Sequence, residues 1–153
     1  MVILDVDGVM TDGRMVFGSN GFEMKFFDVY DGYGITRAIG LGLQIAIISR
    51  GTSEVTAHRA KQLGITEFHQ RALDKVEAFN EIRRKYSFSP DEVCFIGDDE
   101  YDLGLLRIVG LSAAPPTAYP AVLKEVDFVT TAAGGRGCVR EVLDMILRAR
   151  KLL

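Results

Sequence analysis

Short apolar runs alternate with amphipathic stretches along the whole chain, and this alternation constrains the fold more than any other feature of the sequence. Residues 1–4, 43–48 and 93–96 are apolar at almost every position, which is the pattern of strands covered on both faces. Residues 73–86, between the last two runs, place apolar side chains at helical spacing. Strands that alternate with helices predict a parallel sheet flanked by helices.

An insertion interrupts this pattern after the first predicted strand. Two apolar-rich runs, 14–17 and 22–27, flank a Gly-Ser-Asn-Gly sequence at 18–21. Both residues of Asn-Gly tolerate positive φ, which predicts a β-hairpin at about residues 13–28. The expected fold is a doubly wound, Rossmann-like α/β sheet in one domain of residues 1–153, with this small hairpin insertion and no large cap. Further helices are expected at 34–41, 53–63, 99–109, 119–125 and 139–153, and further short strands at 67–69, 111–114 and 128–130.

The composition argues against several classes of partner. The net charge is −3, so bulk electrostatics give no support for nucleic-acid binding. No apolar run reaches the roughly 18 residues that a membrane span needs. Asp5 and Asp7 interrupt the first apolar stretch, so we expect no secretory signal. Cys94 and Cys138 lack partners at metal-ligand spacing. We therefore expect a cytoplasmic protein without a nucleic-acid or membrane partner.

The strongest chemical signal is an Asp-Val-Asp-Gly-Val motif directly after the first predicted strand. Asp5 and Asp7 can point to the same side as the strand ends, and Gly8 lets the backbone turn sharply and approach a ligand. Two carboxylates this close repel each other and need a proton or a cation. Mg²⁺ suits both carboxylate and phosphate oxygens. Taken alone, the motif is also consistent with a solvated Asp-Gly turn.

Other polar residues lie at or just beyond the ends of predicted elements. Ser49 ends the second strand, where a hydroxyl can hold a phosphoryl oxygen, and Asp98 and Asp99 follow the third. Lys75 lies at the start of a helix, where its ammonium could neutralise a transferring phosphoryl group. Asp102 adds another acid to the third motif. Singly, these residues also fit a capping serine, a solvated lysine and an acidic helix N-terminus.

The acid pair, hydroxyl, lysine and second acid pair, in this order, resemble the four motifs of the haloacid dehalogenase superfamily of phosphohydrolases. The matching sequences are D-V-D-G-V at 5–9, I-I-S at 47–49, the segment around Lys75, and G-D-D-E-Y-D at 97–102. The resemblance covers essentially the whole chain. It implies the superfamily's α/β fold, here with only the hairpin at the position of a cap.

Within this superfamily the chain is similar to the group of 3-deoxy-D-manno-octulosonate 8-phosphate phosphatases. Residues 4–13, the Asn-Gly hairpin, residues 31–35 and residues 133–141 carry the similarity. The last stretch, A-G-G-R-G-C-V-R-E, is the most specific, because its glycines make a loop whose backbone can lie against a ligand or a neighbouring subunit.

The resemblance implies roles for the motif residues. Asp5 is the nucleophile that forms an aspartyl phosphate, and Asp7 protonates the leaving sugar oxygen and later activates water. Mg²⁺ is held by the carboxylates of Asp5 and Asp98 and by the backbone carbonyl of Asp7. The remaining roles are binding of phosphoryl oxygens by Ser49 and Lys75, and orientation of Lys75 and its loop by Asp99 and Asp102.

The resemblance also implies contacts with the substrate. Arg136 is the candidate partner for the carboxylate of an acidic sugar, and its loop can reach an adjacent subunit's site. The full set of expected substrate-binding residues is Asp7, Asp28, Asp31, Gly32, Arg59, Lys75 and Arg136. Arg59 and Arg136 are also consistent with a solvated helix arginine and a structural loop.

Three departures from the group's pattern concern the substrate rather than the chemical step. Ser49-Arg50-Gly51 stands where the group often has Thr-Gly-Arg, Tyr30 replaces a basic residue, and Thr36 stands where an arginine is common. Each charge-assisted hydrogen bond lost would cost roughly 1.5–3 kcal/mol of binding. The sequence therefore leaves the identity of the sugar open.

Three alternative functions are also consistent with the sequence. A nonulosonate 9-phosphate phosphatase has the same frame, although Arg136 favours the octulosonate, because the nonulosonate group often has an acid there. A non-catalytic assembly module of the same fold is disfavoured because Asp5, Asp7, Lys75 and Asp98 are all present. A phosphoacceptor receiver domain would place its phosphorylated aspartate on a middle strand, where this chain has Ser49.

The hairpin is the feature that most favours assembly. Its apolar side chains, which include Phe17, Phe22 and Phe26, are too many for a free two-stranded ribbon. The resemblance implies a homotetramer in which hairpins meet and neighbouring loops cover each site. If the octulosonate is the substrate, the implied role is in lipopolysaccharide precursor synthesis. Alternatively, the apolar hairpin residues fold back onto their own domain.

Overall fold

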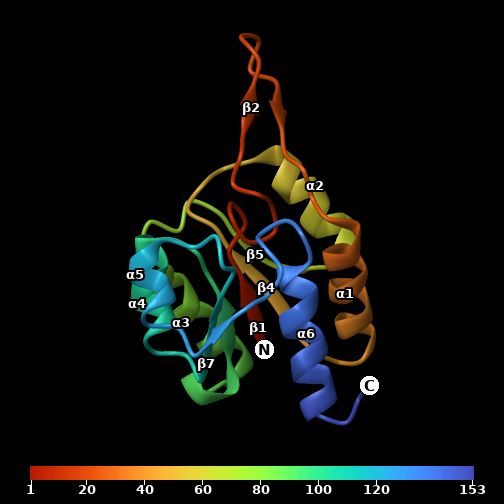
Figure 1. The fold of residues 1–153 in the computed structure, drawn as a ribbon, viewed down its shortest axis with the longest axis vertical. Coiled ribbons are helices and arrows are strands. Elements are labelled where there is room, and N and C mark those ends of the chain that lie inside the picture. Colours follow the sequence, from red (N-terminus) through yellow and green to blue (C-terminus); the bar gives the residue numbers. More distant parts are fainter.

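The computed structural model describes residues 1–153, which build a six-stranded parallel sheet with helices on both faces (Figure 1). The strand order is β5-β4-β1-β6-β7-β8, and every neighbouring pair is parallel. This order reverses at β1 and confirms the predicted doubly wound α/β fold. The strands are β1 (Val2–Leu4), β4 (Ile45–Ile48), β5 (Glu67–His69), β6 (Cys94–Ile96), β7 (Leu111–Ala114) and β8 (Phe128–Val129).

The two faces of the sheet are covered by different helices, as Figure 1 shows. Val2 and Leu4 of β1 pack in one buried cluster with α1, α2 and α6, whereas Ile3 packs in the other with α3, α4 and α5. Both faces of β1 are therefore buried, which explains its continuous apolar run. The helices are α1 (Val29–Gly40), α2 (Glu54–Leu63), α3 (Lys75–Tyr86), α4 (Leu103–Leu106), α5 (Pro120–Leu123) and α6 (Cys138–Ala149), with short 3₁₀ turns η1 (Pro90–Glu92) and η2 (Glu100–Asp102).

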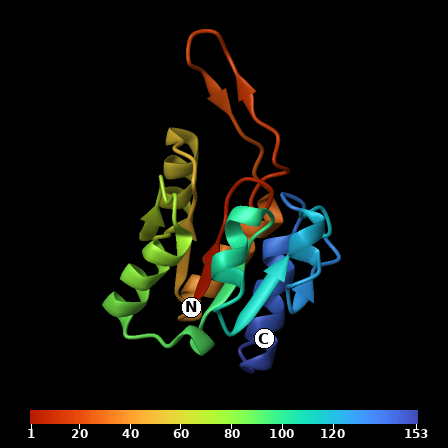
Figure 2. The same cartoon turned by 90° about the vertical axis from the view of Figure 1, so that its left-hand side faces the viewer.

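The predicted hairpin is present as an antiparallel pair, β2 (Val16–Phe17) and β3 (Glu23–Met24). Figures 1 and 2 show it standing away from the body of the protein, beyond the sheet. Phe17 is 67% exposed and Phe26 is 61% exposed, so these side chains do not fold back onto their own domain. The paired segments are shorter than the apolar runs on either side of the turn.

Several predicted element boundaries were wrong. Helix α1 begins at Val29 rather than residue 34, because the Asp28 carboxylate caps it by accepting hydrogen bonds from the backbone N–H groups of Tyr30 and Asp31. The helix expected at 99–109 is divided into η2 and the short α4. Gly64 caps α2 with φ +78°, the left-handed conformation that favours glycine at the end of a helix. No helix in the structure is both long and apolar enough to span a bilayer.

Candidate active site

The polar residues predicted to share one sheet edge line a single cavity of about 320 Å³. Asp5 directly follows β1, Ser49 follows β4, and Asp98 follows β6 after Gly97. Since β1 lies between β4 and β6 and all three are parallel, their carboxyl ends meet. The residues that line the cavity are Asp5, Asp7, Met15, Ser49, Arg50, Gly51, Lys75, Asp98, Asp99, Tyr101 and Asp102.

Lys75 is buried between two carboxylates. It is the first residue of α3, whose N-terminus is capped by Asp74, and this cap fixes where the lysine side chain starts. Its ammonium lies 2.8 Å from Asp5 Oδ1 and 2.5 Å from Asp102 Oδ1. Burial alone would lower the pKa of Lys75, but the two carboxylates outweigh burial and raise that pKa above its ordinary value. Lys75 is therefore held as a cation beside Asp5.

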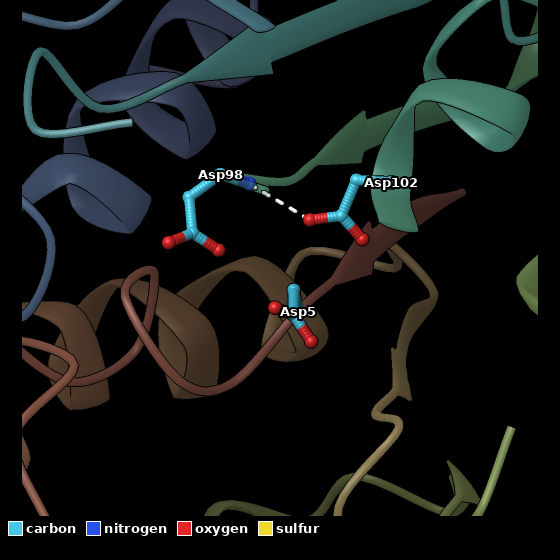
Figure 3. A group of neighbouring side chains, drawn as sticks. All are labelled: Asp5, Asp98 and Asp102. Carbon is cyan, nitrogen blue, oxygen red and sulfur yellow. Dashed lines mark hydrogen bonds between the residues drawn. The ribbon is translucent and has the colours of Figure 1, made fainter. Parts of the chain in front are cut away.

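Asp102 joins the lysine to the loop that follows β6. One of its carboxylate oxygens accepts from Lys75, and the other accepts from the backbone N–H groups of Asp98 at 2.8 Å and Asp99 at 3.1 Å. Figure 3 shows the bond from Asp98. Asp102 is only 1% exposed. Asp102 thus connects the Lys75 side chain to the backbone of this loop. Asp99 instead caps η2, where its side chain accepts from the N–H of Glu100.

Three carboxylates lie close enough together to hold a metal ion. Carboxylate oxygens of Asp5, Asp98 and Asp102 all lie within 4.8 Å of one another, and Figure 3 shows the three side chains around one space. Asp98 Oδ1 is buried and has no hydrogen-bond partner. Lys75 and backbone N–H groups already bind both oxygens of Asp102, whereas Lys75 pairs with Oδ1 of Asp5 and Asp98 Oδ1 has no partner. Asp98 and Asp5 are therefore better candidate ligands than Asp102.

The electrostatics of these acids also fit a divalent cation. Burial, reinforced by repulsion from Asp5 and the neighbouring aspartates, raises the pKa of Asp98 to about 8. Burial raises the pKa of Asp5 to about 6, although Lys75 opposes the shift. A cation between the two carboxylates would satisfy the orphaned oxygen and remove the cost of ionising both acids. All-oxygen ligands of this kind suit Mg²⁺.

Gly8 makes room for this arrangement. Its φ is +89°, and a Cβ at this position would lie 1.9 Å from Asp98 Oδ2. A side chain at residue 8 would therefore both strain the backbone and displace the Asp98 carboxylate. Glycine is therefore required at position 8 both by the positive φ of the turn and by the short distance to the Asp98 carboxylate.

Asp7 has a partner that the sequence analysis missed. Lys25, which follows β3 on the hairpin, donates from Nζ to Asp7 Oδ1 at 2.7 Å and to Oδ2 at 3.0 Å. The Lys25 side chain is only 3% exposed. Glu23 of β3 accepts a hydrogen bond from the Ser53 hydroxyl at 2.7 Å, which ties the hairpin to the start of α2. A single lysine within an apolar hairpin was the only signal in the sequence.

Ser49 lies beside these groups. It is buried, and its backbone N–H donates to the carbonyl of His69 on the neighbouring strand. A Cβ at Gly51 would lie 3.8 Å from both Ser49 Oγ and Asp7 Oδ2, so the loop after β4 passes close to both atoms. The structure thus brings Ser49, Asp5, Asp7, Lys75 and the three later aspartates to one cavity.

The other residues expected to bind substrate do not line this cavity. Asp28 caps α1 and, with Arg136, lines a separate cavity of about 590 Å³ beside the base of the hairpin. Arg59 donates to the backbone carbonyl of Asp28 and packs against Gly32, where a Cβ would lie 2.3 Å from an Arg59 nitrogen.

Asp31 has a different place from the one expected. It is 3% exposed, and its carboxylate accepts from the backbone N–H groups of Gly137 at 3.2 Å and Arg140 at 2.7 Å. These bonds tie the first turn of α1 to the start of α6. Within this chain, Asp31 and the buried Gly32 take part in the packing of α1.

Comparison with known proteins agrees with this fold. The family model of haloacid dehalogenase-like hydrolases matches residues 46–142. The chain belongs to this family. It is 42% identical to the 3-deoxy-D-manno-octulosonate 8-phosphate phosphatase of Escherichia coli K12 over 150 residues, which is 98% of this chain and 80% of the relative.

Solved structures of similar proteins have the same architecture. The 3-deoxy-D-manno-octulosonate 8-phosphate phosphatase of Yersinia pestis superposes with a TM-score of 0.98 at 43% identity, covering 99% of this chain and 82% of that one. The enzyme of that name from Moraxella catarrhalis superposes with a TM-score of 0.95 at 35% identity, covering 99% and 87%. That structure is a complex with a magnesium ion, a phosphate ion and a KDO molecule.

Proposed function

We propose that this protein is a magnesium-dependent phosphatase that hydrolyses 3-deoxy-D-manno-octulosonate 8-phosphate through an aspartyl-phosphate intermediate. One observation carries the proposal most directly. Asp5 lies between the ammonium of Lys75, 2.8 Å away, and the orphaned carboxylate oxygen of Asp98, in a cavity at the carboxyl edge of the sheet. The similarity to phosphatases of this name supports the choice of sugar.

The first half of the reaction transfers the phosphoryl group to Asp5. A carboxylate oxygen of Asp5 forms a bond to phosphorus while the bond from phosphorus to the sugar oxygen breaks. Asp7 gives its proton to the departing oxygen, so this oxygen leaves as a neutral hydroxyl group of the sugar. Lys75 and Ser49 hold phosphoryl oxygens, whose charge is redistributed in the transition state. Asp102 keeps Lys75 in place through the 2.5 Å contact.

The second half returns Asp5 to its starting state. Asp7, now a carboxylate, takes a proton from water as the water oxygen attacks phosphorus, and the bond from phosphorus to Asp5 breaks. Inorganic phosphate leaves, and Asp7 again carries a proton. When bound by the Asp5 and Asp98 carboxylates and the Asp7 carbonyl, Mg²⁺ supplies charge neutralisation between the nucleophile and the phosphate dianion.

Recognition of the sugar is proposed to involve a neighbouring subunit. The catalytic cavity is lined on one side by Met15 of the exposed apolar hairpin, and Asp28 and Arg136 line a separate cavity beside the base of that hairpin. An assembly that packs hairpins together would cover the apolar side chains and could bring Arg136 of one subunit to the site of another. We therefore propose a homotetramer in which Arg136, Asp28 and Arg59 contribute to the sugar pocket.

The cellular role follows from the proposed substrate. Removal of phosphate from this acidic sugar would yield a precursor of lipopolysaccharide, and we propose that the protein acts in the cytoplasm. The departures at Tyr30, Thr36 and Ser49-Arg50-Gly51 lie in segments that concern substrate preference and leave the motif acids intact.

The test is phosphate release with Mg²⁺ from a panel that holds octulosonate 8-phosphate, nonulosonate 9-phosphate and common sugar phosphates, with Asp5→Asn as the control. Release that is fastest from the octulosonate and abolished by Asp5→Asn is expected. Faster release from another sugar would retain the chemistry and reassign the substrate. A folded protein that releases phosphate from none of these esters would contradict the proposal and support an assembly module.

A further inference from the structure

Arg50 and Tyr101 come from opposite sides of Asp5 in the sheet, and their side chains meet. Arg50 follows Ser49 at the end of β4, and Tyr101 lies in η2 after β6. Strand β1, which is followed directly by Asp5, runs between β4 and β6. The guanidinium carbon of Arg50 lies 3.7 Å from the centroid of the Tyr101 ring, and both residues line the catalytic cavity. The pair therefore spans the carboxyl end of β1.

Arg50 is the one cation lining this cavity that no carboxylate neutralises. The other lining cation, Lys75, is paired with Asp5 and Asp102. No ion pair in the structure involves Arg50. Five of the lining residues are aspartates, so a phosphate dianion entering the cavity needs every available cation.

The stack on Tyr101 suits an arginine that binds phosphate. A guanidinium that lies over an aromatic ring keeps its N–H donors at the edge, where they can bind two phosphate oxygens at once. The ring also restricts the rotation of a long side chain, which lowers the entropy lost when the anion binds. The aromatic ring of Tyr101 is sufficient to position Arg50 in this way, and its hydroxyl group is not required.

We propose that Arg50 is a phosphoryl-binding residue of this enzyme and that Tyr101 is its positioning residue. The inference rests on the proposed phosphatase function and deepens it, because it assigns a phosphate-binding arginine that reaches the site across β1. It also gives a function to the Ser49-Arg50-Gly51 order. The arginine stands directly after the hydroxyl residue, and the stack with Tyr101 holds it over the cavity.

The test measures binding of inorganic phosphate by calorimetry in the presence of Mg²⁺, and kcat and KM with p-nitrophenyl phosphate, an ester that carries no sugar. Arg50→Gln is expected to weaken phosphate binding on the order of tenfold or more, since a charge-assisted contact is lost. Tyr101→Leu should weaken it severalfold, and Tyr101→Phe should retain the wild-type affinity because it retains the ring. Arg84→Gln, which removes an exposed arginine from α3, is the matched control.

Wild-type phosphate affinity in folded Arg50→Gln would overturn the proposal, as would failure of the wild-type protein to bind phosphate. Unchanged affinity in Tyr101→Leu would overturn the role of Tyr101. These outcomes are distinct from failure of the proposed function. If the protein binds phosphate through Arg50 but cleaves no ester, only the phosphatase assignment is contradicted. If the protein cleaves esters equally well without Arg50, only this inference is contradicted.

Discussion

Lys25 of the hairpin holds Asp7 of the first motif by both carboxylate oxygens, at 2.7 and 3.0 Å. The two residues are 18 positions apart: Asp7 lies just after β1 of the main sheet, and Lys25 follows β3 of the hairpin. The hairpin is therefore more than a candidate assembly surface. It delivers a buried cation to the residue proposed to move protons in the reaction, so an element outside the main sheet orients a group inside the site.

Replacement of this lysine should slow the step that protonates the leaving sugar. Lys25→Met removes both hydrogen bonds that orient Asp7, and we expect kcat for a sugar phosphate to fall by about 10- to 100-fold, within the range that general acid–base catalysis contributes. With p-nitrophenyl phosphate the loss should be much smaller, because its leaving group needs no proton. Steady-state kinetics on both substrates measure the difference.

The control for this variant is Lys61→Met, which removes an exposed lysine from α2. It should leave both rates unchanged. Equal losses of activity on the two substrates in Lys25→Met would contradict a role through Asp7 and would point to a general disturbance of the hairpin. Partial recovery in Lys25→Arg would support the orienting role.

Magnesium binding should weaken as the pH falls from about 8 to about 6. Burial and the neighbouring acids raise the pKa of Asp98 to about 8, and burial raises the pKa of Asp5 to about 6. Protons therefore occupy these carboxylates in this range and must leave before the metal binds, so binding should release protons at pH 7. Calorimetry in buffers with different ionisation enthalpies measures both the affinity and the number of protons.

Asp99→Asn is the matched control, since Asp99 caps η2 and its carboxylate is not part of the acidic cluster. Asp99 repels Asp98 less than Asp5 and Asp102 do, so its removal should shift the pH dependence only slightly toward lower pH, whereas Asp98→Asn should lose most of the metal affinity. A metal affinity that stays constant between pH 6 and pH 8, without proton release, would show that the two acids are already ionised before the ion binds.

Much of the fold could be predicted because it depends on local patterns. The continuous apolar run of β1 reflects burial on both faces of one strand, and the Asn-Gly turn specified a hairpin. The sequence also predicted that Asp5, Ser49 and Asp98 lie close together, because each follows a parallel strand and the carboxyl ends of these strands share one edge of the sheet. The start of α1 was not predicted, because Gly32 and Gly34 lower the helix propensity of the segment that follows the capping residue Asp28.

The partners of the site residues could not be predicted in the same way. Lys25 reaches Asp7 only because of the direction in which the hairpin leaves the sheet, and Arg50 reaches Tyr101 only because β4 and β6 flank β1. Asp31 lies in a segment that resembles a substrate loop, yet its carboxylate is used by backbone groups of α6 from more than 100 residues away. Such contacts depend on tertiary geometry rather than on spacing along the chain.

Removal of Asp102 should damage both stability and activity. Asp102→Ala would leave the backbone N–H groups of Asp98 and Asp99 without their acceptor, and it would leave buried Lys75 with one carboxylate in place of two. We expect the free energy of unfolding to fall by about 2–4 kcal/mol, the range for a broken buried polar network. Denaturant unfolding of the metal-free protein measures this change.

Asp99→Ala removes a neighbouring acid that is exposed and makes only a local capping bond, so it is the matched control. Its loss of stability should stay near 1 kcal/mol, typical of a cap. If both variants lose the same stability, Asp102 does not join Lys75 to the loop in the way the structure indicates. Activity should also fall much further in Asp102→Ala than in Asp99→Ala, because only Asp102 fixes the lysine proposed to bind phosphate.

Gly8→Ala should abolish metal binding because the new methyl group collides with the Asp98 carboxylate. A control variant can separate this collision from the backbone strain that any side chain causes at positive φ. In Gly8→Ala the new Cβ would lie 1.9 Å from Asp98 Oδ2, so the carboxylate must move out of the metal site. Gly42 is the matched control because its φ of +84° is close to the +89° of Gly8, while a Cβ there meets no atom within 4 Å. Gly42→Ala should lose about 1 kcal/mol of stability and retain Mg²⁺ binding and activity. Calorimetric Mg²⁺ titration of both folded variants decides between the two effects. Normal Mg²⁺ affinity in Gly8→Ala would mean that Asp98 is not a ligand, whereas loss in Gly8→Ala alone would place the ion against the Asp98 carboxylate.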